Sequence, residues 1–431
     1  MEETFQWFRT GKYGLFIHFG LYSIAARHEW VQTLEEISPK DYEKYMDYFN
    51  PDLLRPKEWA RQAKSAGFRY VIITARHHEG FSLWDSEYSD FTIAHTAYGK
   101  DLLKELVDAF REEGLGIGLY YSLLDWHRED FTVDGFHPMR NDETYCKEHP
   151  GDMESYRQFM KNQIRELLTK YGKIDYFWFD FSYEGRKWKN SVGKGPKDWD
   201  SEGLEALVHE LQPHILLNDR LGLGRGVQTP EQFARSQGAE EGQLWETVQT
   251  LNNSWGYDRD NHNYKTPEMV VKQLVDTVSK GGNFVMNVGP NARGEWGEEA
   301  TEILSQVGEW LQKNGDSIYG TTPAPYTCPV DCRYTKKGKK LYLHVMSWPF
   351  RTLLLPELGG KVAFARLLAD GSEIRFVDTK NLPDRRLDND NLYQEVTTAH
   401  IDESLDPSMV MLNLPVKEPD KFVTVIELTL K

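Results

Sequence analysis

The segment KIDYFWFDF, residues 173–181, carries the first side chain suited to chemistry, an aspartate that follows an aromatic run. Successive side chains of a strand point to opposite faces, so Tyr176, Trp178 and Asp180 share one face. A carboxylate beside an aromatic wall is suited to nucleophilic attack on the anomeric carbon of a sugar. Asp180 also has a structural interpretation, as the cap of the loop or helix that follows.

Two adjacent histidines follow another apolar run, in the segment ITARHHEGFSLWDS at residues 72–85. Neutral imidazole offers one donor and one acceptor, so His77 and His78 are suited to binding hydroxyl groups. Neighbouring strand residues face opposite sides, so both could ligate one metal ion only where the strand has become a loop. No HxH, HExxH or carboxylate-bridged pattern accompanies them. We therefore expect hydroxyl recognition, no metal site and no cofactor.

The elements that must position these side chains are short apolar runs that alternate with amphipathic stretches. The runs predict buried strands, at residues 13–20, 70–77, 116–122, 175–181, 215–220, 244–250 and 284–290. Amphipathic helices, each closed by glycine, are predicted at residues 101–114, 153–172 and 266–282. Repeated strand and helix units indicate an α/β protein with a parallel (β/α)8-like barrel, in which irregularities are allowed.

Polar side chains gather at the carboxyl ends of these predicted strands. They are His18, His77, His78, Tyr121, Asp180, Asn218, Asp219, Arg220, Glu246 and Asn287. Packing alone could explain single cases, such as a core histidine at position 18 or a turn at Asn287. Their convergence on one end of a barrel predicts an active site there, because barrel enzymes build their sites at that end.

Composition excludes several classes of partner. The 431 residues carry a formal net charge of −16, which repels nucleic acid and anionic membrane surfaces. No run of about eighteen apolar residues predicts a membrane span. The three cysteines show no CxxC spacing, which favours a reducing compartment, and we expect a cytoplasmic protein. The 13 tryptophans and 22 tyrosines are suited to sugar faces as well as to cores.

The pattern changes after residue 325. Short alternating or β-branched runs, among them residues 339–348, 361–371 and 422–431, are separated by Gly, Pro and charged turns. This is typical of an antiparallel β-sandwich. We expect a barrel domain at residues 1–325 and a sandwich domain at residues 326–431. A structural role for the second domain is favoured over sugar binding.

The whole set of motifs resembles one enzyme family. The motifs are FIHFGLYS, the pair EW at Glu29 and Trp30, FRYVIITARHHEGFSLWDS, GLGIGLYYSLLDW, YGKIDYFWFD, LWETVQTLNNSWGY and SKGGNFVMNVGPNARGEW. Together they are similar to the α-L-fucosidases of glycoside hydrolase family twenty-nine, from about residue 5 to residue 325. The resemblance implies an exo-acting, retaining enzyme with a barrel and a small β-sandwich. It would hydrolyse terminal α-L-fucosyl residues of oligosaccharides or glycoconjugates through a covalent fucosyl-enzyme.

The resemblance also implies roles for individual residues. Asp180 matches the nucleophile. The residues that match sugar-binding positions are His18, Glu29, Trp30, His77, His78, Tyr121, Trp178, Arg220 and Trp255. Among these, Trp255 is expected near the methyl group of the sugar.

Two glutamates compete for the acid/base role. Glu231, in QTPEQF, matches the position used by many family members and is expected on a mobile loop; Glu246, in LWETVQT, lies on a strand. We favour Glu231, because a loop residue can reach over the glycosidic oxygen, and expect Glu246 to bind substrate or orient other groups. Glu231 could also be a helix-start carboxylate after Thr229.

Other functions stay open at this point, namely an inactive, lectin-like fucose-binding protein and a metal-dependent hydrolase. The expected partner is a fucosylated oligosaccharide, and a homo-oligomer is compatible with the sequence.

Overall fold

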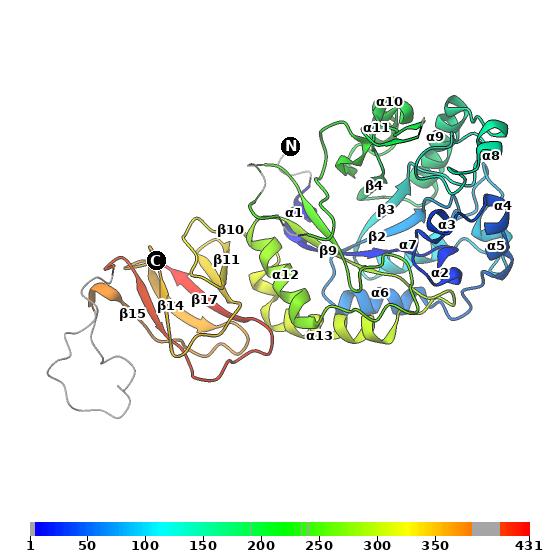
Figure 1. Ribbon diagram of the computed structural model, residues 1–431. Coiled ribbons are helices and arrows are strands. Elements are labelled where there is room, and N and C mark those ends of the chain that lie inside the picture. The colour runs from blue at the N-terminus through cyan, green and yellow to red at the C-terminus, as the bar shows by residue number, and fades with distance from the viewer. Residues whose placement is uncertain (1–4, 190, 234, 239, 241, 382–405) are drawn as a thin grey trace. The chain divides into compact units, whose positions relative to one another are not determined.

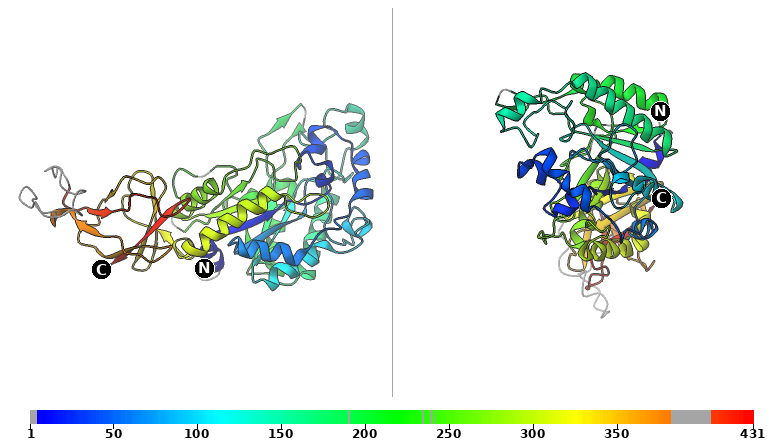
Figure 2. Two further views of the ribbon diagram at one scale, coloured as in Figure 1. Left: turned by 90° about the horizontal axis from the view of Figure 1, so that it is seen from below. Right: turned by 90° about the vertical axis from the view of Figure 1, so that its right-hand side faces the viewer.

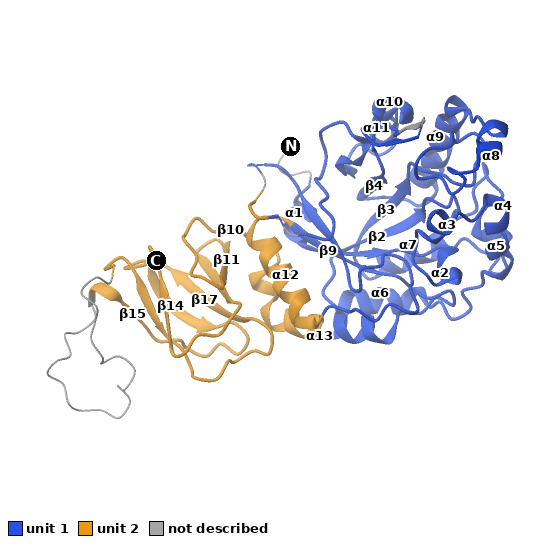
Figure 3. Cartoon of the chain, in the orientation of Figure 1, with its two compact units in different colours: residues 1–235, 239–265, 283–305 blue, residues 236–238, 266–282, 306–431 orange. Residues whose placement is uncertain are grey.

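The computed structural model describes residues 5–189, 191–233, 235–238, 240, 242–381 and 406–431. The chain forms two compact units (Figure 3). The first comprises residues 1–235, 239–265 and 283–305, and the second comprises residues 236–238, 266–282 and 306–431. One amphipathic segment, residues 266–282, thus groups with the C-terminal strands. This grouping concerns packing, and a domain division after residue 325 stays a prediction.

Seven parallel strands form the sheet of the first unit (Figure 1). In spatial order they are β7 (Leu216–Leu217), β4 (Tyr176–Asp180), β3 (Gly116–Ser122), β2 (Tyr70–Arg76), β1 (Tyr13–Ile17), β9 (Asn283–Val288) and β8 (Glu246–Thr250). Each matches a predicted apolar run, and nearly all of their side chains are buried. Burial on both faces is expected for parallel strands covered by helices.

The two edge strands are joined by an extended segment, residues 227–232. The amide of Val227 donates to the carbonyl of Leu217 in β7 at 2.9 Å, and the amide of Glu246 in β8 donates to the carbonyl of Gln228 at 2.9 Å. Parallel bridges run along both sides of the segment. This segment therefore occupies the position of the eighth strand in a (β/α)8-like barrel. The barrel is irregular, because residues 218–226 connect β7 to this segment with one 3-10 turn, η2 (Asp219–Leu221), in place of an α-helix.

Gly226, the last residue of this connection, allows the chain to return into the sheet. Its φ of +104° lies in the region that residues with a side chain rarely adopt, and a Cβ atom there would lie 2.5 Å from the carbonyl oxygen of Asn218. The backbone can turn back into the sheet only because this position lacks a side chain.

Helices follow most strands in chain order (Figures 1 and 2). The longer ones are α6 (Pro56–Ser65), α7 (Leu102–Glu112), α9 (Met153–Lys170), α11 (Ser201–Leu211), α12 (Pro267–Ser279) and α13 (Glu298–Asn314). Shorter ones are α1 (Gln6–Gly11), α2 (Tyr22–Ala25), α3 (Val31–Leu34), α4 (Pro39–Tyr42), α5 (Lys44–Tyr48), α8 (Glu143–Glu148) and α10 (Pro196–Trp199). Three predicted helices begin at side-chain caps, which are Asp101, Asp152 and Thr266. None of the helices in the described ranges is long and apolar enough to cross a bilayer.

The barrel interior is packed with side chains. Its buried cluster includes Phe16, Tyr70 and Tyr120 from β1, β2 and β3, and Tyr176 and Trp178 from β4. At the base of this cluster the ring of Phe8, from α1, lies 5.8 Å from the rings of both Tyr70 and Tyr176. The barrel is therefore a filled core, and space for a ligand remains only at the ends of the strands.

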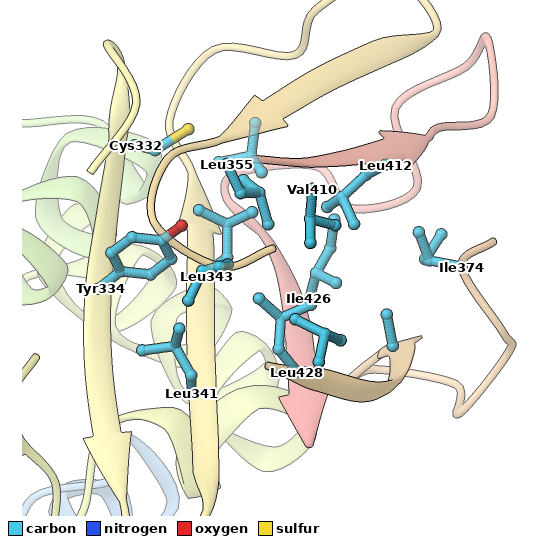
Figure 4. Close-up of a cluster of buried hydrophobic side chains, with 14 of the residues drawn as sticks. Cys332, Tyr334, Leu341, Leu343, Leu355, Ile374, Val410, Leu412, Ile426 and Leu428 are labelled. Carbon is cyan, nitrogen blue, oxygen red and sulfur yellow. The ribbon is translucent and has the colours of Figure 1, made fainter. Parts of the chain in front are cut away.

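The second unit contains two antiparallel sheets. One has the order β10 (Thr322–Pro323), β11 (Cys332–Lys337), β12 (Lys340–Val345), β17 (Thr424–Leu430) and β14 (Val362–Leu367), and the other has β13 (Thr352–Leu355), β16 (Val410–Asn413) and β15 (Phe376–Asp378). Side chains from both sheets meet in one apolar core, where Leu343 and Ile426 lie near Leu355 and Val410 (Figure 4). The expected β-sandwich is confirmed.

Candidate active site

A cavity of about 120 Å³ lies where the barrel strands end. Its lining combines two carboxylates, three histidines and a set of large aromatic rings. The lining residues are Phe16, His18, Trp30, His77, His78, Tyr120, Trp178, Asp180, Phe181, Glu231, Val248 and Trp255. Most of the residues that the sequence predicted for the site therefore meet in one place, including both favoured catalytic residues.

Asp180 ends strand β4 and faces the cavity. Its Oδ2 accepts a hydrogen bond from the hydroxyl of Tyr120 at 2.7 Å, and its Oδ1 lies 3.3 Å from the guanidinium of Arg220. Burial raises the pKa of Asp180 to about 7, against the opposing effect of Arg220. The next residue, Phe181, has a φ of +83°. Strained backbone of this kind is often found at functional sites, and here it follows the candidate nucleophile directly.

Tyr121, which the resemblance matches to a sugar-binding position, does not line the cavity. Tyr121 donates to Gln163 of α9 at 2.9 Å and its ring contacts Arg76, so it lies on the helix side of β3. Its neighbour Tyr120 faces the cavity instead. Strand alternation explains the difference, because register pairs Tyr120 with Trp178 of β4. Alternation along GIGLYYS puts Tyr120 and Ser122 on one face and Tyr121 on the other, and the structure shows which of the two faces the cavity.

Glu231 lies on the extended segment 227–232, held between two strands rather than on a free loop. Its Oε1 pairs with Nη2 of Arg220, whose Nη1 contacts Asp180. The guanidinium of Arg220 lies 5.0 Å from the ring centroid of Trp178. Arg220 therefore bridges the two carboxylates, and its guanidinium packs against the indole of Trp178. It is not among the residues that line the cavity.

Glu246 does not line the cavity, contrary to its predicted role in substrate binding. Its carboxylate is fully buried inside the barrel, where it accepts hydrogen bonds from Tyr70, Tyr176 and Trp178 at 2.8, 2.9 and 3.0 Å. Burial raises its pKa to about 7. The side chain points along the filled core because Glu246 sits at the first residue of β8, not at its end. It orients Trp178 and cannot reach a sugar.

His18 is held in one tautomer. Its Nδ1 lies 2.6 Å from Oδ1 of Asn287, whose Nδ2 donates to the carbonyl of Trp255. Since Nδ2 is engaged there, Oδ1 must accept, and His18 carries its proton on Nδ1. Burial lowers the pKa of His18 to about 3, so the ring is neutral. Its Nε2 is then an acceptor for a hydroxyl group.

The same reasoning applies to His78. Its Nδ1 lies 2.7 Å from Oγ of Ser122, and that hydroxyl donates its own proton to the carbonyl of Leu124. His78 therefore donates through Nδ1, and Nε2 is an acceptor that lies 3.8 Å from Oδ2 of Asp180. Two acceptors at this distance can share a donor placed between them, such as a sugar hydroxyl. Burial also holds the pKa values of His77 and His78 well below the usual range.

Aromatic rings form the walls. The ring of Trp30 lies 5.0 Å from that of His78, and the ring of Trp255 lies 5.4 Å from that of His18. Glu29, which we expected to grip a hydroxyl, instead accepts from the amides of Trp255 and Gly256 at 3.2 and 2.8 Å. Burial raises its pKa to about 7. Glu29 therefore acts on the site through the loop that carries Trp255.

Sequence reasoning missed several residues of the site. Tyr120 and Ser122 hydrogen-bond to Asp180 and His78, and Phe181 completes the wall, whereas Asn287, which the sequence places at a strand end, holds His18. Alternation identifies the first two, whereas partners such as Asn287 and His18, 269 positions apart, are brought together only by strand register. Within the described ranges no three His, Cys, Asp or Glu side chains converge as a metal ligand set.

The known proteins that this chain matches are fucosidases. The family model described as Alpha-L-fucosidase matches residues 1–316. The human plasma α-L-fucosidase is 32% identical over 381 residues, which covers 80% of this chain and 76% of the relative. The structure of α-L-fucosidase isoenzyme 1 from Paenibacillus thiaminolyticus is 41% identical, covers 100% of this chain and 99% of the other, and has a TM-score of 0.89.

A third relative links the fold to a reaction intermediate. A family 29 α-L-fucosidase from Bacteroides thetaiotaomicron, trapped as a covalent intermediate with 2-fluoro-fucosyl fluoride, is 28% identical with a TM-score of 0.82. That alignment covers 100% of this chain and 97% of the other. None of these comparisons supports a lectin. The chain belongs to the α-L-fucosidase family, glycoside hydrolase family 29.

Proposed function

We propose that this enzyme is an exo-acting, retaining α-L-fucosidase in which Asp180 is the nucleophile and Glu231 the acid/base. The observation that carries the proposal is the pairing of these two carboxylates in one small cavity, bridged by Arg220. A double displacement requires carboxyl groups about 5 to 5.5 Å apart. A single guanidinium in contact with both keeps them close.

In the first step Asp180 attacks the anomeric carbon while Glu231 protonates the departing glycosidic oxygen. Tyr120 and Arg220 stabilise the ionised form of Asp180, which is the attacking form. Arg220 engages Oε1 of Glu231, so Oε2 is the oxygen available to the leaving group. In the second step Glu231 takes a proton from water, and the water attacks the fucosyl-enzyme. Two inversions at the anomeric carbon yield α-L-fucose.

The remaining lining suits a single terminal sugar. Neutral His18 and His78 each present an acceptor Nε2 to hydroxyl groups, and Trp30, Trp178 and Trp255 offer apolar faces. The cavity ends against the filled barrel core, with Phe16 and Val248 at its wall. A chain that continued beyond the sugar in both directions would not fit, and this favours exo action on fucosylated oligosaccharides or glycoconjugates.

Proton NMR of the first-formed sugar, released from an aryl α-L-fucoside, tests this function. We expect α-L-fucose as the first anomer, with mutarotation to the β form later. First appearance of β-L-fucose would exclude the double displacement. Absence of turnover on any fucoside, by a protein that still binds fucose, would instead favour the lectin-like alternative.

We further propose a cytoplasmic location; a homo-oligomer is compatible with the sequence. The location is supported by Cys146, Cys328 and Cys332, which are all unpaired. Thiol titration of protein extracted without reductant should find three thiols, and fewer would argue for an oxidising compartment. Light scattering after size exclusion measures the oligomeric state, because the mass in solution is compared with the 50.1 kDa of one chain.

A further inference from the structure

A second cavity, of about 480 Å³, lies in the same unit as the active site. Its lining comes from the segment after β3, from helix α8 and the two residues that follow its end, and from Trp188 and Lys189 at the end of β5 (Lys187–Trp188). The residues that matter here are Asp134, Arg140, Glu143, Lys147, Trp188 and Lys189. The reaction described above uses none of them.

Residues 134–136 connect the second cavity to the wall of the active site. Phe136 lies on the active-site side, where its ring is 5.0 Å from that of Phe181 and 5.7 Å from that of Trp30. Asp134, two residues earlier, lines the second cavity. The lining of the second cavity and two wall residues of the active site, Trp30 and Phe181, are thus connected through this segment.

Trp188 gives the second cavity an exposed aromatic surface. The side chain is 41% exposed although tryptophan is usually covered. It is held in place by close packing, because a Cβ atom on Gly135 would lie 2.6 Å from Cβ of Trp188. The guanidinium of Arg140 lies 5.8 Å from the ring centroid. An exposed, positioned indole offers a stacking surface for the apolar face of a sugar ring.

The charges around this surface are mainly positive. The lining contains three cations, which are Arg140, Lys147 and Lys189. It contains one accessible carboxylate, that of Glu143. The carboxylate of Asp134 is already bound by Lys194 and Tyr183, and its side chain is 1% exposed.

Part of this positive charge is available to a ligand. Arg140 has a partner in Glu36 at 3.4 Å, whereas neither Lys147 nor Lys189 forms an ion pair with a residue that the structure describes. In a chain of net charge −16 this local excess of cations favours an anionic ligand.

We propose that the second cavity binds an acidic sugar, bearing a carboxylate or a sulfate, of the glycan whose terminal fucose occupies the active site. The sugar ring stacks on Trp188 and its anionic group is bound by Lys147 and Lys189. This inference rests on the proposed fucosidase activity, and it makes the cavity a determinant of which glycans are cleaved.

Hydrolysis of matched substrates tests the proposal. The substrates are one neutral fucosylated oligosaccharide, its sialylated counterpart, its sulfated counterpart and an aryl α-L-fucoside. The enzymes are the wild type, the double variant Lys147→Ala/Lys189→Ala, its Lys147→Arg/Lys189→Arg counterpart, Trp188→Ala and a control, Lys64→Ala, which removes an exposed lysine on α6.

Exposed charge pairs change an equilibrium by about two- to fivefold each, so the wild type should prefer an acidic glycan by about five- to tenfold in kcat/KM. The double alanine variant should lose that preference, the arginine variant and Lys64→Ala should keep it, and Trp188→Ala should weaken cleavage of all three oligosaccharides. All variants should cleave the aryl fucoside at the wild-type rate. The sialylated and sulfated arms show which anion is preferred.

Equal kcat/KM values for neutral and acidic glycans in the wild type would overturn the proposal, as would an acidic preference that survives in the double alanine variant. Neither result would affect the proposed function, because the aryl fucoside is measured on the same preparations. Failure to cleave the aryl fucoside would instead overturn the function itself.

Discussion

Removal of the Tyr120 hydroxyl should shift the pH dependence of turnover. Tyr120 donates to Asp180 at 2.7 Å, and this bond favours the ionised carboxylate. Hydrogen bonds to charged groups contribute about 1.5 to 3 kcal/mol. One pH unit corresponds to about 1.4 kcal/mol, so Tyr120→Phe should raise the pKa of Asp180 by about one to two units.

Because the nucleophile must be ionised, activity is lost as the pH falls through the pKa of Asp180, which lies at about 7. In Tyr120→Phe the acidic limb of kcat/KM should therefore move upward by that amount. The assay is initial-rate kinetics on an aryl α-L-fucoside from pH 5 to 9. Tyr121→Phe is the matched control, since its hydroxyl bonds to Gln163 on the helix side.

An unmoved limb in Tyr120→Phe would refute the assignment of Tyr120 to the nucleophile. If Tyr121→Phe moved the acidic limb by the same amount, Tyr121 and not Tyr120 would be the tyrosine that faces Asp180. Each variant needs an unfolding curve at pH 7, so that a loss of fold is not mistaken for a change in titration.

Three further predictions concern the acid/base, the buried Glu246 and the extended segment 227–232. Glu231→Ala should slow oligosaccharides far more than activated aryl fucosides and regain turnover with azide as β-fucosyl azide, whereas Glu246→Ala should show neither effect. Glu246 has a folded pKa near 7, above the ordinary 4.5, so its contribution to stability is present below pH 4.5 and lost as the pH rises to 7. Glu246→Gln should thus make the melting temperature fall less over that range, and an unchanged slope would contradict this. Gly226→Ala should destabilise the fold by about 1 to 3 kcal/mol in denaturant titrations and reduce kcat, whereas Gly224→Ala, also at positive φ but with open space, should cost less.

Much of the barrel is predictable from the sequence because its strands are buried on both faces. The run YVIITAR at residues 70–76 is apolar apart from its end, and helix α9 repeats its apolar residues with helical spacing. The extended segment 227–232, which takes the place of the eighth strand, was not predictable in this way. Residues 227–232 read VQTPEQ, which is polar, and their strand-like role comes from hydrogen bonds to two neighbours.

The same limit applies within the site. Asp180 and Trp178 follow from alternation along one strand, and Trp30 follows from family resemblance. The role of Glu29 does not, and for Glu246 the sequence left substrate binding and the orientation of other groups both open. Each role depends on what lies opposite in space: two backbone amides for Glu29, and a tyrosine pair with an indole for Glu246. A motif identifies that a residue matters, and only packing shows whether it contacts the substrate.

The covalent intermediate offers the most direct test of the catalytic assignment. The enzyme would be incubated with 2-fluoro-fucosyl fluoride and its peptides sequenced by tandem mass spectrometry. We expect one fluorofucosyl group per chain, attached to the side chain of Asp180 in the peptide that contains residues 174–185. A label on Glu231, on Glu246 or on any other residue would contradict the assignment of Asp180 as the nucleophile.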